Sequence, residues 1–308
     1  MKAAVERIEG MKAKSLYREQ YDREMMPLSY APWLLDAVCG DHWKVVCVVE
    51  HGEIKAFLIF RSMKRRFTTL ESILPNFGES PLWICSLEGW SDQEKVSKEL
   101  EWLNLLIESL PNYDHLCIPL PSNLSNWLPF YWQGFEQKTM YSFELYLPEL
   151  ETSTNRNSPF TIQPWSIKEG VNQKVKPYTK RSFKYIERNK HWLHTAELHH
   201  QLLGLMAVGP SGEIVGHSFV MYNHNQANEW YESSLKGEGA EQVRMQFLET
   251  WQQKLPEFTA KLILAYPNHW DARQIYQRIG AVPVRRLIVE HMTSPILGIK
   301  QLFRSKPF

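Results

Sequence analysis

KLILAYPNHWDARQIYQRIGAVPVRRLIVEHM, at residues 261–292, combines a strand, a helix and a second strand in one short unit. Residues 261–266 form an apolar run closed by Pro267, which predicts a buried strand. Apolar residues at helical spacing follow, with Asn268 as a cap and Gly280 as the stop. The last part is rich in β-branched and aliphatic residues, which predicts a strand in a covered sheet. This order of strand, helix and strand decides how the rest of the chain is interpreted.

The composition predicts a folded chain with two domains. Its 308 residues exceed the roughly 100–200 residues that are typical of one domain. The 35 basic and 34 acidic residues leave a net charge of +1, which argues against a protein that coats nucleic acid. We place the domains at 1–150 and 151–308, because residues 148–160 are rich in Ser, Thr, Asn and Pro and predict a linker.

Cysteine usage and hydropathy indicate the compartment. The four cysteines lie in the first half without a Cys-x-x-Cys pair, so neither a disulfide framework nor a zinc site is indicated. The N-terminal residues are charged throughout and do not resemble a signal peptide. No segment reaches the roughly 18 to 20 consecutive apolar residues that span a bilayer. We therefore expect a cytoplasmic protein without a membrane span.

An internal repeat relates the two halves of the chain. Gly52–Ile54 and Gly212–Ile214 share the sequence Gly-Glu-Ile, and each lies at the turn of a predicted β-hairpin. An amphipathic helix follows in each half and ends before a proline, Pro111 or Pro256. Each half then continues with a strand, a helix ending in glycine, and a long strand. The repeat predicts an α/β (α+β) fold of two tandem units, each a mixed, mostly antiparallel sheet flanked by helices.

The spacing of Asn268, Ala272, Tyr276 and Gly280 resembles the C-terminal motif of the GNAT (GCN5-related N-acyltransferase) superfamily. Ala281 departs from that motif, in which an aromatic residue usually follows the glycine. A tandem pair of such units is also similar to the Fem-like aminoacyl transferases. The resemblance implies two tandem GNAT-like units that transfer an acyl or aminoacyl group.

The segment before the long helix of the second half carries the candidate donor site. Residues 229–235 predict a strand, and a glycine-rich loop leads from it to a helix that begins at Glu241. Glycines let backbone N–H groups approach a pyrophosphate at a helix N-terminus. The resemblance implies that acetyl-CoA or another acyl-CoA contacts Ser234, Leu235, Lys236, Gly237, Gly239, Ala240 and Asn268.

Two features of this loop keep a second interpretation open. Ser234 stands where GNAT proteins usually carry Arg or Gln, and Glu238 brings negative charge towards a bound anion. An ordinary glycine-rich turn between a strand and a helix has the same sequence pattern. A non-catalytic protein that keeps the GNAT fold is therefore an alternative.

Acyl transfer to an amine needs a base for the amine and an acid for the departing thiolate. The resemblance implies that Tyr276 is the acid. Phe130 occupies the equivalent position in the first half, so we expect catalysis in the second half. A core aromatic residue is the alternative interpretation of Tyr276. Glu229 and Glu232 are candidate bases on opposite faces of the predicted strand, and the sequence leaves open which face meets the substrate.

A basic segment at residues 174–190 is the candidate site for an anionic partner. If the segment is helical, one stripe is formed by Lys180, Lys184 and Arg188. A bound tRNA charged with an amino acid would relieve their mutual repulsion. A nucleotide-linked substrate or the CoA phosphate would do the same. A solvated lysine face is the alternative.

Four histidines, at positions 191, 194, 199 and 200, invite a metal interpretation. No carboxylate framework accompanies them, so we expect no metal site. The leading predicted function is transfer of an acyl group from acyl-CoA to an amine of an unidentified acceptor. Fem-like aminoacyl transfer from charged tRNA is the alternative, and the acceptor and the oligomeric state stay open.

Overall fold

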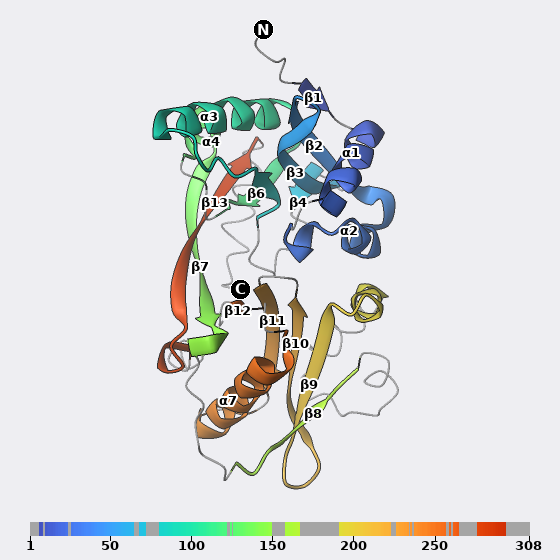
Figure 1. Ribbon diagram of the computed structural model, residues 1–308, viewed down its shortest axis with the longest axis vertical. Helices are drawn as coiled ribbons and strands as arrows, with labels where there is room; N and C mark the ends of the chain where they lie inside the picture. Colours follow the sequence, from blue (N-terminus) through green and yellow to red (C-terminus); the bar gives the residue numbers. More distant parts are fainter. Residues whose placement is uncertain are drawn as a thin grey trace. The chain divides into compact units, whose positions relative to one another are not determined.

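The computed structural model describes residues 6–8, 10–23, 26–64, 68–71, 80–121, 124, 126–149, 158–166, 191–222, 226–233, 235, 237–256, 259, 261–264 and 276–293. The chain divides into two compact units, and Figure 1 shows their helices and strands. The first unit contains residues 1–75, 79–140 and 285–308, and the second contains residues 76–78 and 141–284. The domains at 1–150 and 151–308 stay a prediction. Their edges differ from those of the units because the strands β7 (Glu136–Tyr146) and β13 (Val282–Met292) each run through a unit boundary.

The first unit contains a mixed sheet. Its strand order is β1-β2-β3-β4-β6-β13, and β5 pairs with β3. Neighbouring strands whose pairing is given are antiparallel except β4 and β6, which run parallel. The bounds of the other strands are β1 Glu6–Ile8, β2 Trp43–Glu50, β3 Glu53–Lys64, β4 Thr68–Glu71, β5 Leu82–Ile84 and β6 His115–Pro119.

The longest helix of the first unit, α3, begins at a side-chain cap. Ser91 and Glu94 form a capping box at the start of α3, so each side chain satisfies a backbone N–H group of the other residue. Asn126 Oδ1 accepts a 2.9 Å hydrogen bond from Leu128 N, directly before α4. The helices are α1 Gly10–Arg23, α2 Pro32–Cys39, α3 Asp92–Glu108 and α4 Leu128–Trp132, with 3-10 turns η1 Leu28–Tyr30 and η2 Gly40–His42.

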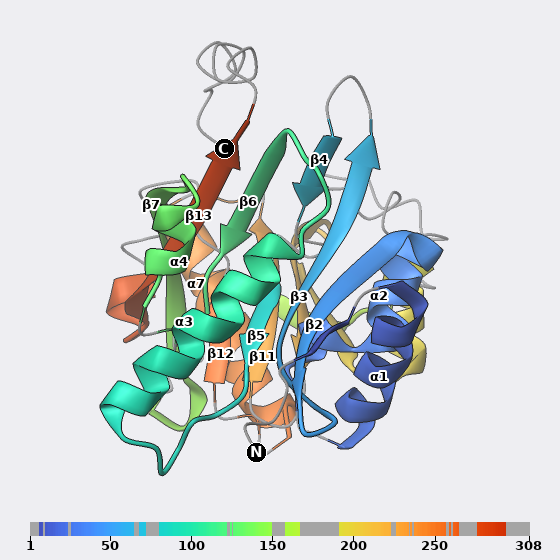
Figure 2. The same ribbon diagram turned by 90° about the horizontal axis from the view of Figure 1, so that it is seen from above.

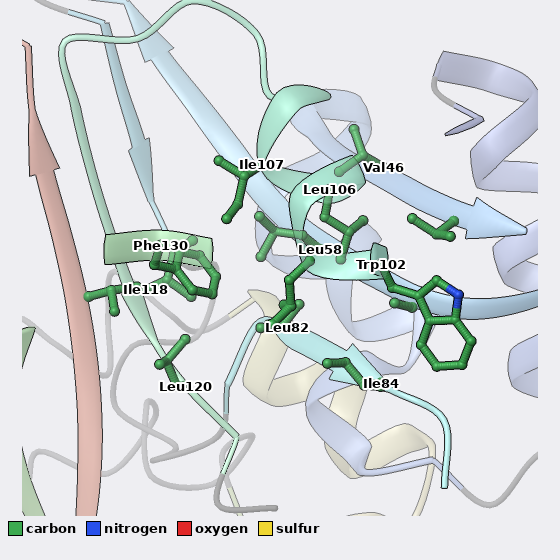
Figure 3. Packing of buried hydrophobic residues seen from close by; sticks show 14 of the residues in the cluster. Val46, Leu58, Leu82, Ile84, Trp102, Leu106, Ile107, Ile118, Leu120 and Phe130 are labelled. Carbon is green, nitrogen blue, oxygen red and sulfur yellow. The ribbon is translucent and has the colours of Figure 1, made fainter. Parts of the chain in front are cut away.

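Helices cover both faces of the sheet in the first unit. On one face, Trp102 of α3 packs in a core cluster with Val46 and Leu58 (Figure 3). On the other face, Tyr17 of α1 makes an edge contact with Phe57 at a ring-centroid distance of 4.9 Å. Figure 2 shows α3 lying across the strands of this unit, with α1 and α2 beside β2. The alternation of side chains along β2 and β3 explains why both faces are apolar.

The second unit repeats this arrangement. Its strand order is β8-β9-β10-β11-β12-β7, and here too only one described pair, β11 and β12, is parallel. The face of α7 predicted to be apolar is confirmed, because Val243, Phe247 and Trp251 are fully buried. The remaining bounds are β8 Thr161–Pro164, β9 Leu202–Val208, β10 Ile214–Tyr222, β11 Gln226–Ser233, β12 Lys261–Leu264, α7 Gly237–Lys254 and the 3-10 turn η4 Leu147–Glu149.

The shared topology confirms the predicted fold class of two tandem units, but the last strands are exchanged. In the first unit, β6 pairs with residues 288–292 of β13, which follow the second copy in sequence. In the second unit, β12 pairs with residues 143–146 of β7, which follow the first copy. Sequence periodicity predicts both long strands and contains no information about which sheet each one joins.

Equivalent side-chain contacts mark the register of the exchanged strands. Lys261 Nζ lies 2.7 Å from Glu144 Oε2, and His115 Nε2 lies 2.8 Å from Glu290 Oε1. Each basic residue begins its strand, and each glutamate lies ten residues after the glycine at position 134 or 280. Both pairs are diagonal cross-strand neighbours, so slippage by one residue would separate them.

Two local features do not follow from sequence periodicity. Residues 62–90 are poorly periodic, yet they contain the end of β3 and all of β4 and β5. Val96 is apolar but 37% exposed, whereas α3 buries Trp102 and Leu106. Among the helices that the structure describes, none combines the length and apolar character needed to cross a bilayer.

Candidate active site in the second unit

The connection from β11 to α7 differs in length from its counterpart in the first unit. β11 ends at Ser233 and α7 begins at Gly237, whereas β4 ends at Glu71 and α3 begins at Asp92. The helix predicted to begin at Glu241 begins at Gly237, so residues 237–240 form the first turn of α7 and not a loop. The backbone N–H groups of this turn lack acceptors within the helix. These N–H groups and the helix dipole together favour an anionic group at this turn.

Gly239 lies inside that first turn, although glycine costs up to about 1 kcal/mol relative to alanine in a helix. A Cβ atom added there would lie 3.6 Å from Leu235 Cδ1 and 3.8 Å from Phe160 Cζ, which are ordinary van der Waals distances. The φ angle of Gly239 is also outside the left-handed region. The fold itself therefore gives no steric reason for glycine at this position.

Acidic side chains also lie at the first turn of α7. Glu238 is exposed and accepts a 3.4 Å hydrogen bond from Gln242 Nε2. Glu241 pairs with Arg278, whose Nη1 lies 2.9 Å from Glu241 Oε2. Arg278 thus offsets the charge of Glu241, while Glu238 keeps negative charge near the helix N-terminus.

A buried ion pair joins β11 to α7. The side chains of Glu229 and Arg244 are each 1% exposed. Arg244 Nη1 donates to Glu229 Oε1 at 2.6 Å, and Arg244 Nη2 donates to Glu229 Oε2. Ser218 Oγ also donates to Glu229 Oε1 at 2.6 Å, and it accepts a 2.9 Å hydrogen bond from Trp251 Nε1. Glu229 therefore faces α7, with both carboxylate oxygens hydrogen-bonded.

Tyr276 lies against this ion pair. It is 4% exposed, and its ring centroid lies 5.2 Å from Arg244 Cζ and 5.3 Å from the ring centroid of Phe143. Gly280 follows with a φ angle of 78°, the left-handed conformation that commonly ends a helix. The structure thus brings two predicted site residues, Glu229 and Tyr276, together through Arg244, which the sequence analysis did not single out.

Glu232 lies opposite His217 in the ladder between β10 and β11. His217 is 6% exposed, and its ring centroid lies 5.7 Å from that of Trp165 and 5.4 Å from that of Phe219. Burial lowers the pKa of His217 to about 4, so its imidazole is neutral at physiological pH. By strand alternation, the positions of Glu232 and His217 lie on the face opposite Glu229. No sequence motif singles out His217, although the register of the predicted hairpin could have placed it beside a candidate base.

The structure describes two of the remaining predicted site residues. Leu235 is half-buried and packs against the core of the second unit, and Ala240 is half-buried in the first turn of α7. Within the described ranges, no group of three or more His, Cys, Asp or Glu residues could hold a metal ion. The predicted residues without a described position are Ser234, Lys236, Asn268, Lys180, Lys184 and Arg188.

Solved structures resemble this chain over nearly its whole length. A tandem GNAT protein from the clavulanic acid biosynthesis pathway, solved without AcCoA, aligns with a TM-score of 0.57 and 10% identity, covering 95% of this chain and 99% of that one. The chain therefore has a tandem GNAT fold. FemX aligns with a TM-score of 0.56 and 7% identity, covering 97% of this chain and 100% of FemX.

A GNAT-family acetyltransferase from Colwellia psychrerythraea also shares the GNAT fold. It aligns with a TM-score of 0.50 and 10% identity, covering 94% of this chain and 100% of that one. No protein-family model matches the sequence, and no curated protein matches it either. The predicted resemblance to GNAT proteins is thus confirmed for the fold.

The two GNAT units differ at the candidate acid. Four residues before the helix-ending glycine, the second unit has Tyr276 and the first has Phe130. Phe130 is 1% exposed and packs in the core of the first unit. A phenylalanine therefore satisfies the packing of this position, and the hydroxyl group is particular to the second GNAT unit.

Proposed function

We propose that the second GNAT unit transfers an acyl group from acyl-CoA to an amine of an acceptor molecule. The observation that carries this proposal is Gly239 in the first turn of α7. The fold has room for a Cβ atom at this residue, and alanine would stabilise the helix. Close approach of a ligand to the backbone explains why glycine is present instead.

The pyrophosphate of CoA would be held by the backbone N–H groups of residues 237–240. The helix dipole adds favourable potential there, and Glu238 opposes it. We extend the donor site to Ser234, Leu235, Lys236 and Asn268 on the GNAT pattern. The donor supplies a thioester, whose carbonyl carbon is the reacting centre.

In the transfer step, the amine nitrogen forms a bond to the thioester carbonyl carbon, and the carbon–sulfur bond breaks. The amine loses a proton to a base and the departing thiolate gains one from an acid, so protons and charges balance. Tyr276 is the proposed acid. Glu232 is the proposed base, because Glu229 has both carboxylate oxygens engaged in the core. The described pairing of β11 with β12 ends at Glu229, so a donor that enters between the two strands beyond that residue would meet both faces of the sheet.

Calorimetry with free CoA, acetyl-CoA and a longer acyl-CoA tests the donor site. Gly239→Ala is expected to weaken CoA binding at least tenfold, because a methyl group would occupy the space next to the pyrophosphate. The same change is expected to raise the free energy of unfolding by up to about 1 kcal/mol. Gln253→Ala, at an exposed position in the last turn of the same helix, is the matched control for both measurements.

The outcomes separate cleanly. Absence of heat with all three ligands would remove CoA as the donor. Loss of stability in Gly239→Ala would instead mean that the fold requires this glycine. Tyr276→Phe tests the acid separately. A lower kcat with unchanged CoA affinity supports Tyr276 as the acid, and unchanged turnover would mean that Tyr276 contributes only to packing.

A further inference from the structure

We infer that Glu229 and Arg244 are positioning residues that hold Tyr276 in place, and that Glu229 is not a proton carrier. The inference rests on the proposed function, in which Tyr276 is the acid. Its geometric basis is the chain of contacts from Ser218 through Glu229 and Arg244 to the ring of Tyr276. This chain joins β10, β11, α7 and the helix that ends at Gly280.

The bidentate contact fixes the plane of the Arg244 guanidinium. Two parallel hydrogen bonds to one carboxylate leave the guanidinium little freedom to rotate, and Ser218 anchors the carboxylate in turn. Trp251 donates to Ser218 and is itself fully buried. The cation therefore presents a fixed face to the ring of Tyr276, with Cζ 5.2 Å from the ring centroid.

The first GNAT unit shows that the fold does not need this arrangement. Counting back twelve residues from the proline after each long helix, Arg244 corresponds to Glu99, which is 7% exposed. Tyr276 corresponds to Phe130. The unit without the hydroxyl group therefore also lacks the arginine. The cation and the hydroxyl occur together in the second unit, as expected if one serves the other.

Energetics also argue against stability as the reason for the pair. Moving two charges out of water costs several kcal/mol per ion, and a well-packed apolar pair of similar volume is often as stable or more so. Stability alone therefore does not explain an ion pair between two side chains that are each 1% exposed. Orientation of the Arg244 guanidinium does explain it, because guanidinium and carboxylate groups meet in only a few geometries.

Fluorine NMR of protein labelled with 3-fluorotyrosine tests whether the pair holds Tyr276. The chain has 13 tyrosines, and the resonance of Tyr276 is the one that Tyr276→Phe removes. Arg244→Met is expected to shift and broaden this resonance, because the ring loses its fixed neighbour. Arg18→Met is the matched control, since Arg18 also makes two bonds to a carboxylate, that of Asp36, and lies over an aromatic ring, that of Trp43.

A variant with both charges removed guards against simple unfolding. Glu229→Met/Arg244→Met leaves no unpaired charge in the core and is expected to keep the melting temperature while showing the same altered Tyr276 resonance. An unchanged Tyr276 resonance in this folded variant would overturn the inference. This measurement needs no substrate, so it stands apart from whether CoA is the donor.

A kinetic cycle tests the link to the acid. With acyl-CoA as donor, Arg244→Met is expected to lower kcat about tenfold or more at unchanged KM for acyl-CoA, since misplacement by about 1 Å can cost 100-fold. In the Tyr276→Phe background, the same change is expected to lower kcat by less than twofold. Equal losses in both backgrounds would show that Arg244 acts independently of Tyr276. Wild-type protein that binds no acyl-CoA would contradict the proposed function, and the NMR result would still decide the positioning role.

Discussion

Acidification should destabilise the second unit through His217. This histidine is 6% exposed and packs among aromatic rings, and burial lowers its pKa from 6.5 to about 4. The unfolded chain therefore takes up the proton first as the pH falls. The stability that the neutral imidazole contributes is complete above the unfolded pKa of 6.5, and it declines as the pH falls towards 4.

The magnitude follows from the difference between the two pKa values. Between about pH 7.5 and about pH 4.5, a histidine that titrates at 6.5 when unfolded and about 4 when folded reduces the free energy of unfolding by about 2.5 kcal/mol. Most of that loss falls below the unfolded pKa, at about 1.4 kcal/mol per pH unit. Acidic residues add their own pH dependence, so the quantity to measure is a difference between variants.

Urea unfolding of wild type and His217→Gln at a series of pH values isolates this contribution. Glutamine does not titrate, so the stability difference between the two proteins should shift by about 2.5 kcal/mol in favour of the variant between about pH 7.5 and about pH 4.5. His42→Gln, at an exposed position, is the control for replacing a histidine by glutamine. A difference between wild type and His217→Gln that stays constant over this range would refute the reasoning.

Three further predictions concern caps, strand packing and the basic segment. Ser91→Ala should lower the free energy of unfolding by about 1 kcal/mol, because it removes a capping box, and an unchanged urea midpoint would contradict this. Gly204→Ala should lower the free energy of unfolding by about 1–3 kcal/mol, since a Cβ atom would lie 2.3 Å from the Trp165 carbonyl oxygen. Gly239→Ala should not lower it, and equal midpoints of the two variants in thermal unfolding would contradict this contrast. Charge reversal at Lys180, Lys184 and Arg188 should abolish salt-sensitive tRNA binding in a filter assay if the chain uses an aminoacyl-tRNA donor, and tRNA binding that survives the reversal would exclude this segment as its site.

Short-range patterns predicted the parts of the fold that depend on neighbours in sequence. The hairpin turns at Gly52 and Gly212 lie in the left-handed conformation, with φ angles of 80° and 83°. The buried face of α7 follows from apolar residues at helical spacing, and the internal repeat follows from the order of such elements. The turns and the helix face are each contained within about twenty residues, and the repeat is the same order of such local signals found twice, so no tertiary contact is needed to find them.

The candidate site was less accessible to such reasoning because it depends on faces and distant partners. Strand alternation placed Glu229 and Glu232 on opposite sides but could not say which side meets α7. Arg244 looks like one more polar residue on an amphipathic helix, and only the structure shows it buried against Glu229. The roles of Glu232, Gly239 and Tyr276 in transfer stay predictions for the measurements described above.

The exchanged strands have a consequence for how the chain matures during synthesis. One edge of β6, at residues 115–119, stays unpaired until β13 has been translated, whereas all other described strands of that sheet are translated much earlier. A nascent first half therefore exposes backbone donors and acceptors to other growing chains. Either half expressed by itself would lack the strand that pairs with its β6 or β12 in the full chain, and we expect the unpaired edge to associate with other chains.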